Sequence, residues 1–229
     1  RNNIESIRIC DREYPELLKN IKDPPDTIYF AGDIALIKGV SAAVVGTRKC
    51  SEYGRQTALR IGRMLGKNKV TVVSGMAAGI DAHAHAGALD AGGKTVAVLA
   101  CGPDICYPRE NRKIYEMIRE KGLIISEHPP GTEPKPWHFP MRNRIISGVS
   151  LLTVVVEAGT GSGAIITGSS RTGPGCNGGT WKYKQPIQPR RQQADSRWGC
   201  CSDGAGGYIE GCRHRASNGS GRNGKNGRR

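Results

Sequence analysis

Short apolar runs rich in β-branched residues alternate along the chain with segments of helical periodicity. The runs cover residues 42–46, 70–75, 95–102, 123–126 and 151–159. The segments between them carry helix signals, with Ser51 placed to cap one helix and Gly122 placed to end another. Continuous apolar strands that alternate with helices are typical of a parallel sheet buried on both faces. We therefore predict an α/β fold with a Rossmann-like, doubly wound, mostly parallel sheet over residues 41–167.

Residues 1–40 follow a different pattern. A short helical stretch is stopped by Pro24 and Pro25, and a strand then ends at Gly32. Because the segment carries no obvious chemistry, we expect an N-terminal extension that packs on the core.

Residues 168–229 differ from the rest in composition. They hold 12 Lys/Arg against 3 Asp/Glu, 14 of the 32 glycines, and neither Leu nor Val. A segment with so little aliphatic surface to bury cannot offset the entropy that ordering costs. We predict a disordered, basic, glycine-rich tail.

Cysteine usage and hydropathy indicate a cytoplasmic protein. The 8 cysteines include no C-x-x-C pair, which favours free thiols over a metal site or a disulfide framework. No apolar run is long enough to span a bilayer, and the N-terminus does not resemble a signal peptide. We expect no metal, no cofactor and no membrane contact, and the opening Arg1 suggests a fragment.

Glycine-rich turns follow three of the predicted strands. In a parallel sheet these turns lie at one edge, where glycine and the N–H groups of a helix N-terminus favour a phosphate. The candidate ligand-binding residues in the turns are Thr47, Arg48, Lys49, Ser74, Gly75, Gly79, Gly161 and Ser162. A dinucleotide or NTP site is disfavoured, because the first turn has neither G-x-G-x-x-G nor a P-loop.

Basic residues near the same edge suit a ligand with several phosphates in a row. Arg48 and Lys49 follow the first strand, and Arg142 and Arg144 lie in the stretch "FPMRNRIISG" at 139–148. A nucleic acid backbone is such a ligand. The alternative is that any one of these arginines pairs with Glu127 or Glu157.

Phe139, at the start of the same stretch, has two interpretations that the sequence leaves open. In one, its ring stacks on a base while Arg142 and Arg144 hold phosphates and Ile145 and Ile146 anchor the following helix. In the other, Phe139 is a core or hinge residue.

Catalytic chemistry finds no support in the sequence. His83 and His85 stand two apart and would point to different sides of a helix, so a shared metal is disfavoured. Asp81 is placed to cap a helix. The sequence pattern does not require any nucleophile, base and orienting third group to come together in one site.

Extended motifs resemble those of the DNA-processing protein A (DprA/Smf) family over about residues 14–167. They include "AVVGTRKCSEYG", "VVSGMAAGIDAHAHAGAL" and "ISEHPPGTEPKPWHFPMRNRIISGVS". The family's G-[ST]-R turn matches residues 46–48, its S-G-x-A-x-G-I-D motif matches residues 74–81, and its F-P-x-R-N-R segment matches residues 139–144, including Asn143. The resemblance implies a non-catalytic protein that binds single-stranded DNA without sequence preference, protects it, and loads the RecA recombinase during natural transformation. It also implies a homodimer, which is in doubt here because later family segments are missing.

Two alternatives to this function remain. One is a nucleotide phosphoribohydrolase of the "lonely guy" type, whose catalytic Glu follows a glycine turn, whereas Glu157 precedes Gly159 here. The other is a non-functional fragment.

The tail itself suggests how such a fragment could arise. Codons exist for residues 190–199 that, read one nucleotide later, give the family's missing G-x-N-x-L-I-x-x-G-A segment. The same shift over residues 173–181 can return its V-x-A-V-P-G strand. We therefore expect residues 168–229 to be largely out-of-frame translation, which would leave a sheet edge open and lower stability.

Overall fold

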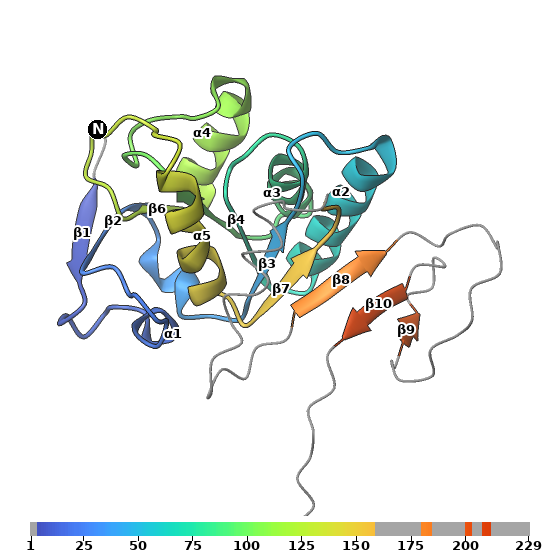
Figure 1. The fold of residues 1–229 in the computed structure, drawn as a ribbon, viewed down its shortest axis with the longest axis horizontal. Coiled ribbons are helices and arrows are strands. Elements are labelled where there is room, and N and C mark those ends of the chain that lie inside the picture. Colours follow the sequence, from blue (N-terminus) through green and yellow to red (C-terminus); the bar gives the residue numbers. More distant parts are fainter. Residues whose placement is uncertain (1–3, 159–179, 185–199, 203–207, 212–229) are drawn as a thin grey trace, which may run out of the picture.

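The computed structural model describes residues 4–158 and three short segments, 180–184, 200–202 and 208–211. Its centre is a parallel sheet (Figure 1) made of β3 (Ser41–Val45), β4 (Thr71–Ser74), β5 (Thr95–Leu99), β6 (Leu123–Ser126) and β7 (Leu152–Val155). Across the sheet these strands run β6-β5-β4-β3-β7, so strand order reverses between β3 and β7. Each predicted apolar run coincides with one strand, which confirms the predicted α/β sheet.

The N-terminal segment extends the sheet at its β6 edge. Strand β2 (Thr27–Gly32) pairs antiparallel with β6, and β1 (Glu5–Arg8) pairs antiparallel with β2. Between β1 and β2 lies α1 (Glu16–Lys19), and η1 (Ile34–Ile37) follows β2. The Tyr14 hydroxyl donates to the Pro25 carbonyl over 2.6 Å, which fixes the loop between these strands. The extension therefore adds two strands to the sheet, and its apolar side chains join the same core.

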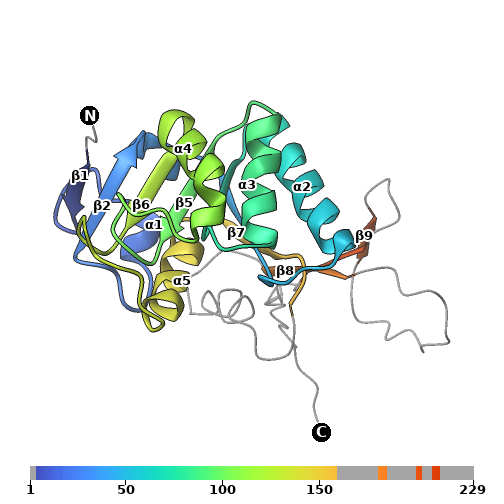
Figure 2. The same ribbon diagram turned by 90° about the horizontal axis from the view of Figure 1, so that it is seen from above.

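Helices cover both faces of the sheet (Figure 2). One face carries α2 (Glu52–Lys67), α3 (Ile80–Asp90) and α4 (Arg112–Lys121), and the other carries α1 and α5 (His138–Gly148). Successive strand residues point to opposite faces. Val44 packs in the cluster with α2 and α3, whereas Val45 joins the cluster that holds Ile145 and Ile146. This two-sided burial explains why the strands are apolar throughout.

The helix ends agree with the sequence signals except at α5. The Ser51 hydroxyl accepts from the Gly54 N–H over 3.0 Å and caps α2, and Gly122 ends α4, which follows η2 (Arg109–Asn111). Helix α5 begins at His138. The sequence pattern had placed residues 139–144 ahead of a helix that begins near Ile145. In the structure these residues lie within the helix.

Helices α2 and α3 pack backbone against backbone. A Cβ at Gly62 would collide with the carbonyl of Ala84, and a Cβ at Gly87 would collide with the carbonyl of Leu59. Interiors are packed too densely for such a group to be absorbed without movement. The two helices are thus held at a separation that only glycine permits.

Three strands lie in the segment that was predicted to be disordered. Strand β8 (Thr180–Lys184) pairs parallel with β7, and β10 (Tyr208–Gly211) pairs antiparallel with both β8 and β9 (Cys200–Ser202). The alternating, aromatic pattern "TWKYK" of β8 favours a strand. The other residues of 168–229 lie outside the described part, so disorder there stays a prediction.

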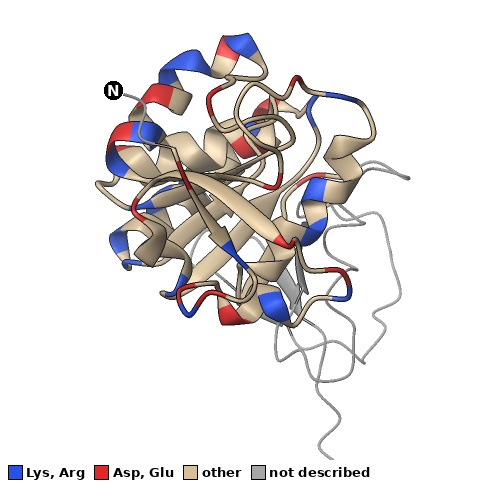
Figure 3. Ribbon diagram, turned by 90° about the vertical axis from the view of Figure 1, so that its left-hand side faces the viewer, with Lys and Arg blue, Asp and Glu red and all other residues tan. Residues whose placement is uncertain are grey.

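Charges are interspersed on the side of the molecule that Figure 3 faces, where Lys/Arg and Asp/Glu alternate along helices and loops. No large face of one sign is visible in this view. Within the described ranges, no helix combines the length and the apolar character needed to cross a bilayer. On this side of the molecule (Figure 3), the described residues therefore offer no extended basic surface to an anionic ligand.

Candidate nucleic-acid interface

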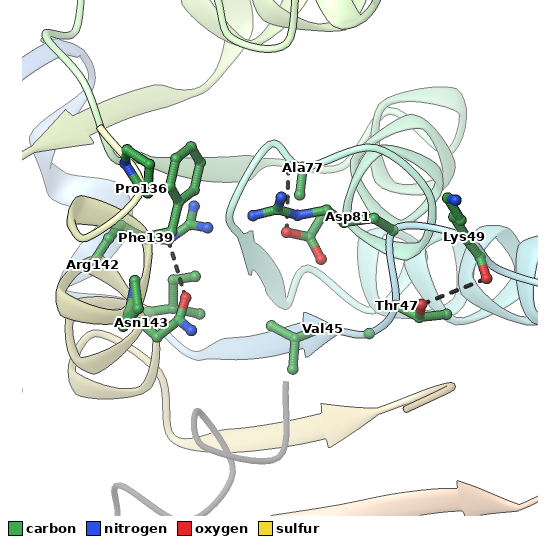
Figure 4. A pocket seen from close by; sticks show the side chains of 13 residues that line it. Val45, Thr47, Lys49, Ala77, Asp81, Pro136, Phe139, Arg142 and Asn143 are labelled. Carbon is green, nitrogen blue, oxygen red and sulfur yellow. Dashed lines mark hydrogen bonds between the residues drawn. The ribbon is translucent and has the colours of Figure 1, made fainter. Parts of the chain in front are cut away.

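A hollow of about 540 Å³ lies at the carboxyl end of β3, between the loop that follows this strand and helix α5 (Figure 4). This is the edge where strand order reverses, the usual place for a ligand in an open α/β sheet. The residues that line it are Val45, Gly46, Thr47, Arg48, Lys49, Ala77, Asp81, Pro136, Phe139, Pro140, Arg142, Asn143 and Ile146. Two predicted turns and the "FPMRNRIISG" stretch thus meet at one site.

The loop after β3 forms one wall, and Glu157 holds it in place. The Glu157 carbonyl accepts from the Thr47 N–H over 2.7 Å, and its carboxylate accepts from the Ser51 N–H and hydroxyl over 3.0 Å. From the other side, Gly79 (φ +80°) packs so closely that a Cβ would collide with the carbonyls of Thr47 and Arg48. The backbone that carries the two cations is therefore fixed before any ligand arrives.

Arg48 and Lys49 supply exposed positive charge at the mouth of the hollow. Across the described residues, neither side chain forms an ion pair with a carboxylate. The Arg48 guanidinium lies 5.0 Å from the centre of the Phe139 ring, a cation–π contact. A charge held by a ring and not by a carboxylate remains available to a phosphate.

Helix α5 forms the opposite wall with one of its faces. Phe139, Arg142, Asn143 and Ile146 all line the hollow and are spaced i, i+3, i+4 and i+7, so they project to the same side of the helix. Figure 4 labels the first three of them on α5. Phe139 is partly exposed and lines the hollow, so it is not a core residue. A ring that lines the hollow and contacts the Arg48 guanidinium fits the stacking interpretation.

Arg142 lines the hollow but is 5% exposed. Its Nη1 donates to the carbonyls of Gly75 and Val98, the latter over 2.6 Å, and its Nε donates to Asn143 Oδ1 over 3.2 Å. These bonds tie α5 to the ends of β4 and β5. A direct phosphate contact from Arg142 stays a prediction, and the geometry gives this side chain a positioning role.

Asp81 and Ser74 organise the turn after β4. The Asp81 carboxylate accepts from the N–H groups of Gly75 (3.1 Å) and Ala77 (3.4 Å), and the Ser74 hydroxyl donates to the Val44 carbonyl over 2.6 Å. Burial raises the pKa of Asp81 from its ordinary value, while the Arg142 charge and the two N–H groups oppose that rise. The Asp81 carboxylate therefore caps the turn, and Ser74 is engaged within the sheet.

Arg144 does not line the hollow. Its guanidinium pairs with Glu127 over 2.6 Å and with Asp23 over 3.2 Å, and its side chain is 17% exposed. On a helix, two positions correspond to about 200° of rotation, so Arg144 faces away from Arg142. The structure follows the alternative that the sequence left open, in which one of the arginines pairs with Glu127.

Two of the predicted site residues cannot be placed, and one organising residue was missed. Gly161 and Ser162 lie outside the described residues. Glu157 was weighed as a partner for an arginine and against the catalytic Glu of a hydrolase, but not as an organiser of the loop after β3. It follows β7, the strand that pairs with β3. That adjacency was the available signal, since a side chain just past β7 must lie beside the loop after β3.

The fold and the site define a Rossmann-like α/β protein with a basic hollow at the strand-order switch point. The chain belongs to the DNA recombination-mediator protein A family, whose model matches residues 5–172. The match ends close to residue 168, where the composition changes.

Curated relatives and solved structures agree with this assignment. The DNA processing protein DprA of Bacillus subtilis (strain 168) is 42% identical over 165 residues, which is 72% of this chain and 56% of that protein. The protein Smf of Synechocystis is 44% identical over 173 residues, 73% of this chain and 43% of that protein. The chain thus spans about half the length of these relatives.

Two solved structures share the fold at substantial identity. DprA from Streptococcus pneumoniae has a TM-score of 0.69 at 40% identity and is covered over 58% of its length by 72% of this chain. DprA from Helicobacter pylori, described in terms of its single-stranded DNA binding mode, has a TM-score of 0.67 at 30% identity over 75% of its length and 73% of this chain.

Proposed function

We propose that this protein binds single-stranded DNA as a recombination mediator of natural transformation, with the hollow between the β3 loop and α5 as its binding site. The observation that carries the proposal is that two exposed cations, Arg48 and Lys49, line one hollow with the ring of Phe139, which Arg48 contacts. Proteins that bind single strands without sequence preference combine phosphate-binding cations with aromatic rings on which bases stack. The family of the chain supports the same function.

The proposal also covers where the protein acts, its partner and the residues that contact the DNA. The protein acts in the cytoplasm, without catalysis, protects the strand and passes it to the RecA recombinase. The homodimer that the family resemblance implies stays a prediction. Thr47, Arg48, Lys49, Phe139 and Asn143 contact the DNA. Arg142, Asp81 and the 74–79 turn shape the site around it.

The structure also bears on the competing hydrolase. The Glu157 carboxylate is engaged by the Ser51 N–H and hydroxyl, so it serves the loop and not a substrate. This supports a binding role over a phosphoribohydrolase. Release of free base from AMP by the purified protein would favour the enzyme instead.

Arg48→Ala tests the site directly. We expect affinity for single-stranded DNA to fall about tenfold on every sequence, since one charge-assisted contact is lost. The slope of log affinity against log salt should fall by about 0.7 for one phosphate contact. Fluorescence anisotropy with oligonucleotides of several compositions measures both quantities.

The matched control is Arg55→Ala, which removes an equal charge on α2 from a side chain that is 49% exposed, pairs with Glu52 and does not line the hollow. It should change affinity little. Equal losses for the two variants would mean that net charge alone attracts the DNA, and no loss for Arg48→Ala would reject the site.

A further inference from the structure

A second, smaller hollow of about 190 Å³ adjoins the first across the Arg48–Phe139 contact. Both side chains line both hollows, so together they form a common wall. The other lining residues are Gly75, Ala77 and Ala78 from the turn after β4, and Tyr107, Pro108 and Glu110 from the segment between β5 and α4. Neither Tyr107 nor Glu110 was among the residues that the sequence predicted to bind DNA.

Tyr107 differs from the tyrosines that stabilise the core. The hydroxyls of Tyr14 and Tyr115 each donate to a backbone carbonyl over 2.6 Å, and both side chains are 2% exposed. Tyr107 is 44% exposed, and its ring centre lies 5.7 Å from that of Phe139 at an angle of 55°. A partly exposed aromatic ring placed beside another ring offers a face for a planar ligand.

The two hollows are lined by different charged side chains, which indicates a different ligand group for each. The first carries Arg48 and Lys49 at its mouth, whereas the second adds the exposed carboxylate of Glu110 to a floor of backbone. A carboxylate repels a phosphate but accepts hydrogen bonds from the amino group of a base, as Glu and Asp do with the cytosine N4 amine. The second hollow therefore suits a base and disfavours a backbone phosphate.

We propose that this second hollow is a nucleobase subsite, in which Tyr107 stacks on the base next to the phosphate held at Arg48. Glu110 accepts from the amino group of that base and so favours cytosine over thymine at this one position. The proposal rests on the proposed function and adds a second stacking position across the common wall.

Variants of Tyr107 provide the first test. Tyr107→Ala should weaken binding of oligo(dC) about fivefold or more, the lower bound of a lost base–aromatic stack, whereas Tyr107→Phe should retain the wild-type affinity because the ring remains. Glu110→Gln should reduce the preference for oligo(dC) over oligo(dT) without abolishing binding. Equal affinity for Tyr107→Ala and wild type would overturn the proposal.

Crosslinking of the unaltered protein provides a test that does not depend on the folding of a variant. Oligonucleotides with a single 5-iododeoxycytidine, which keeps the amino group of cytosine, are irradiated in the complex and mapped by mass spectrometry, and they should crosslink to Tyr107. Crosslinks to Phe139 without any to Tyr107 would show that no base stacks on Tyr107 and would overturn the subsite, although the proposed function would stand. If Arg48→Ala and Arg55→Ala bind DNA equally and no crosslink forms on either ring, the proposed function fails as well.

Discussion

Arg142 and Arg48 both line the larger hollow, but they lie in different environments. The Arg142 guanidinium is buried and satisfies two backbone carbonyls from neighbouring strands, whereas Arg48 is exposed and contacts a ring. Removing the donor of a buried carbonyl leaves that carbonyl unsatisfied and costs free energy. Removing an exposed cation leaves no buried group unsatisfied. The two arginines therefore predict different outcomes on substitution.

Arg142→Ala should lower the free energy of unfolding by about 3 kcal/mol, because two hydrogen bonds from a charged group are removed and two acceptors remain buried. Urea unfolding followed by circular dichroism measures this change. DNA binding should also fall, because less of the protein is folded and because the 74–79 turn is no longer held in place.

Arg48→Ala is the control for that measurement. As an exposed substitution it should change the free energy of unfolding by no more than about 0.5 kcal/mol while it weakens DNA binding. If Arg142→Ala left stability unchanged and still abolished binding, Arg142 would be a direct DNA ligand and not a positioning residue.

Helix α3 packs on the sheet through a histidine whose tautomer the hydrogen bonds determine. The Thr95 hydroxyl donates to the Val72 carbonyl over 2.8 Å, so His85 Nδ1, 2.7 Å from that hydroxyl oxygen, must carry the proton and donate. Nε2 is then an acceptor, is buried, and has no partner among the described residues. A proton added there would place a charge in the core.

This arrangement predicts a pH dependence of stability. Burial, with a smaller effect of the Arg142 charge, lowers the pKa of His85 to about 3, whereas the unfolded chain has the ordinary value near 6.5. Below about pH 6.5 the unfolded state therefore binds a proton at His85 that the folded state does not bind. Stability is fully present above that pH and falls by up to about 1.4 kcal/mol per pH unit as the pH drops toward 3.

The measurement compares wild type with His85→Gln in urea between pH 7 and pH 4.5. The other titrating groups are common to both proteins, so the difference in slope isolates His85. A wild-type slope no steeper than that of the variant would show that this histidine is protonated in the folded state.

The elements themselves were predictable from local pattern, but the direction of their side chains was not. The apolar runs and the Ser51 cap identified strands and helices, because burial on both faces and capping leave marks in adjacent residues. The start of α5 left no such mark, since it has no side-chain cap. Without that boundary, Arg142 and Arg144 could not be assigned to opposite sides of a helix.

At the scale of the whole molecule, the family match and the amino-acid composition change within a few residues of each other. The match ends at residue 172, and the glycine-rich, basic composition begins at 168. The expected homodimer and the out-of-frame origin of the tail stay predictions.

The coding DNA across residues 160–210 tests the origin of the tail. Read one nucleotide later, it should encode Gly-Arg-Asp-Val-Met-Ala-Val-Pro-Gly at the position of 173–181 and Gly-Gly-Asn-Lys-Leu-Ile-Arg-Asp-Gly-Ala at that of 190–199. Each match alone is permissive because codons are degenerate. Absence of family-like sequence in the shifted frame would reject the idea.

The glycine contact between α2 and α3 has a consequence for how related sequences are compared. Gly62 and Gly87 have no room for a methyl group, so substitution there should be rare for reasons of helix separation alone. Neither residue lines a hollow. In an alignment they would be as invariant as a DNA ligand such as Arg48, so invariance by itself would overstate the size of the binding site in this family.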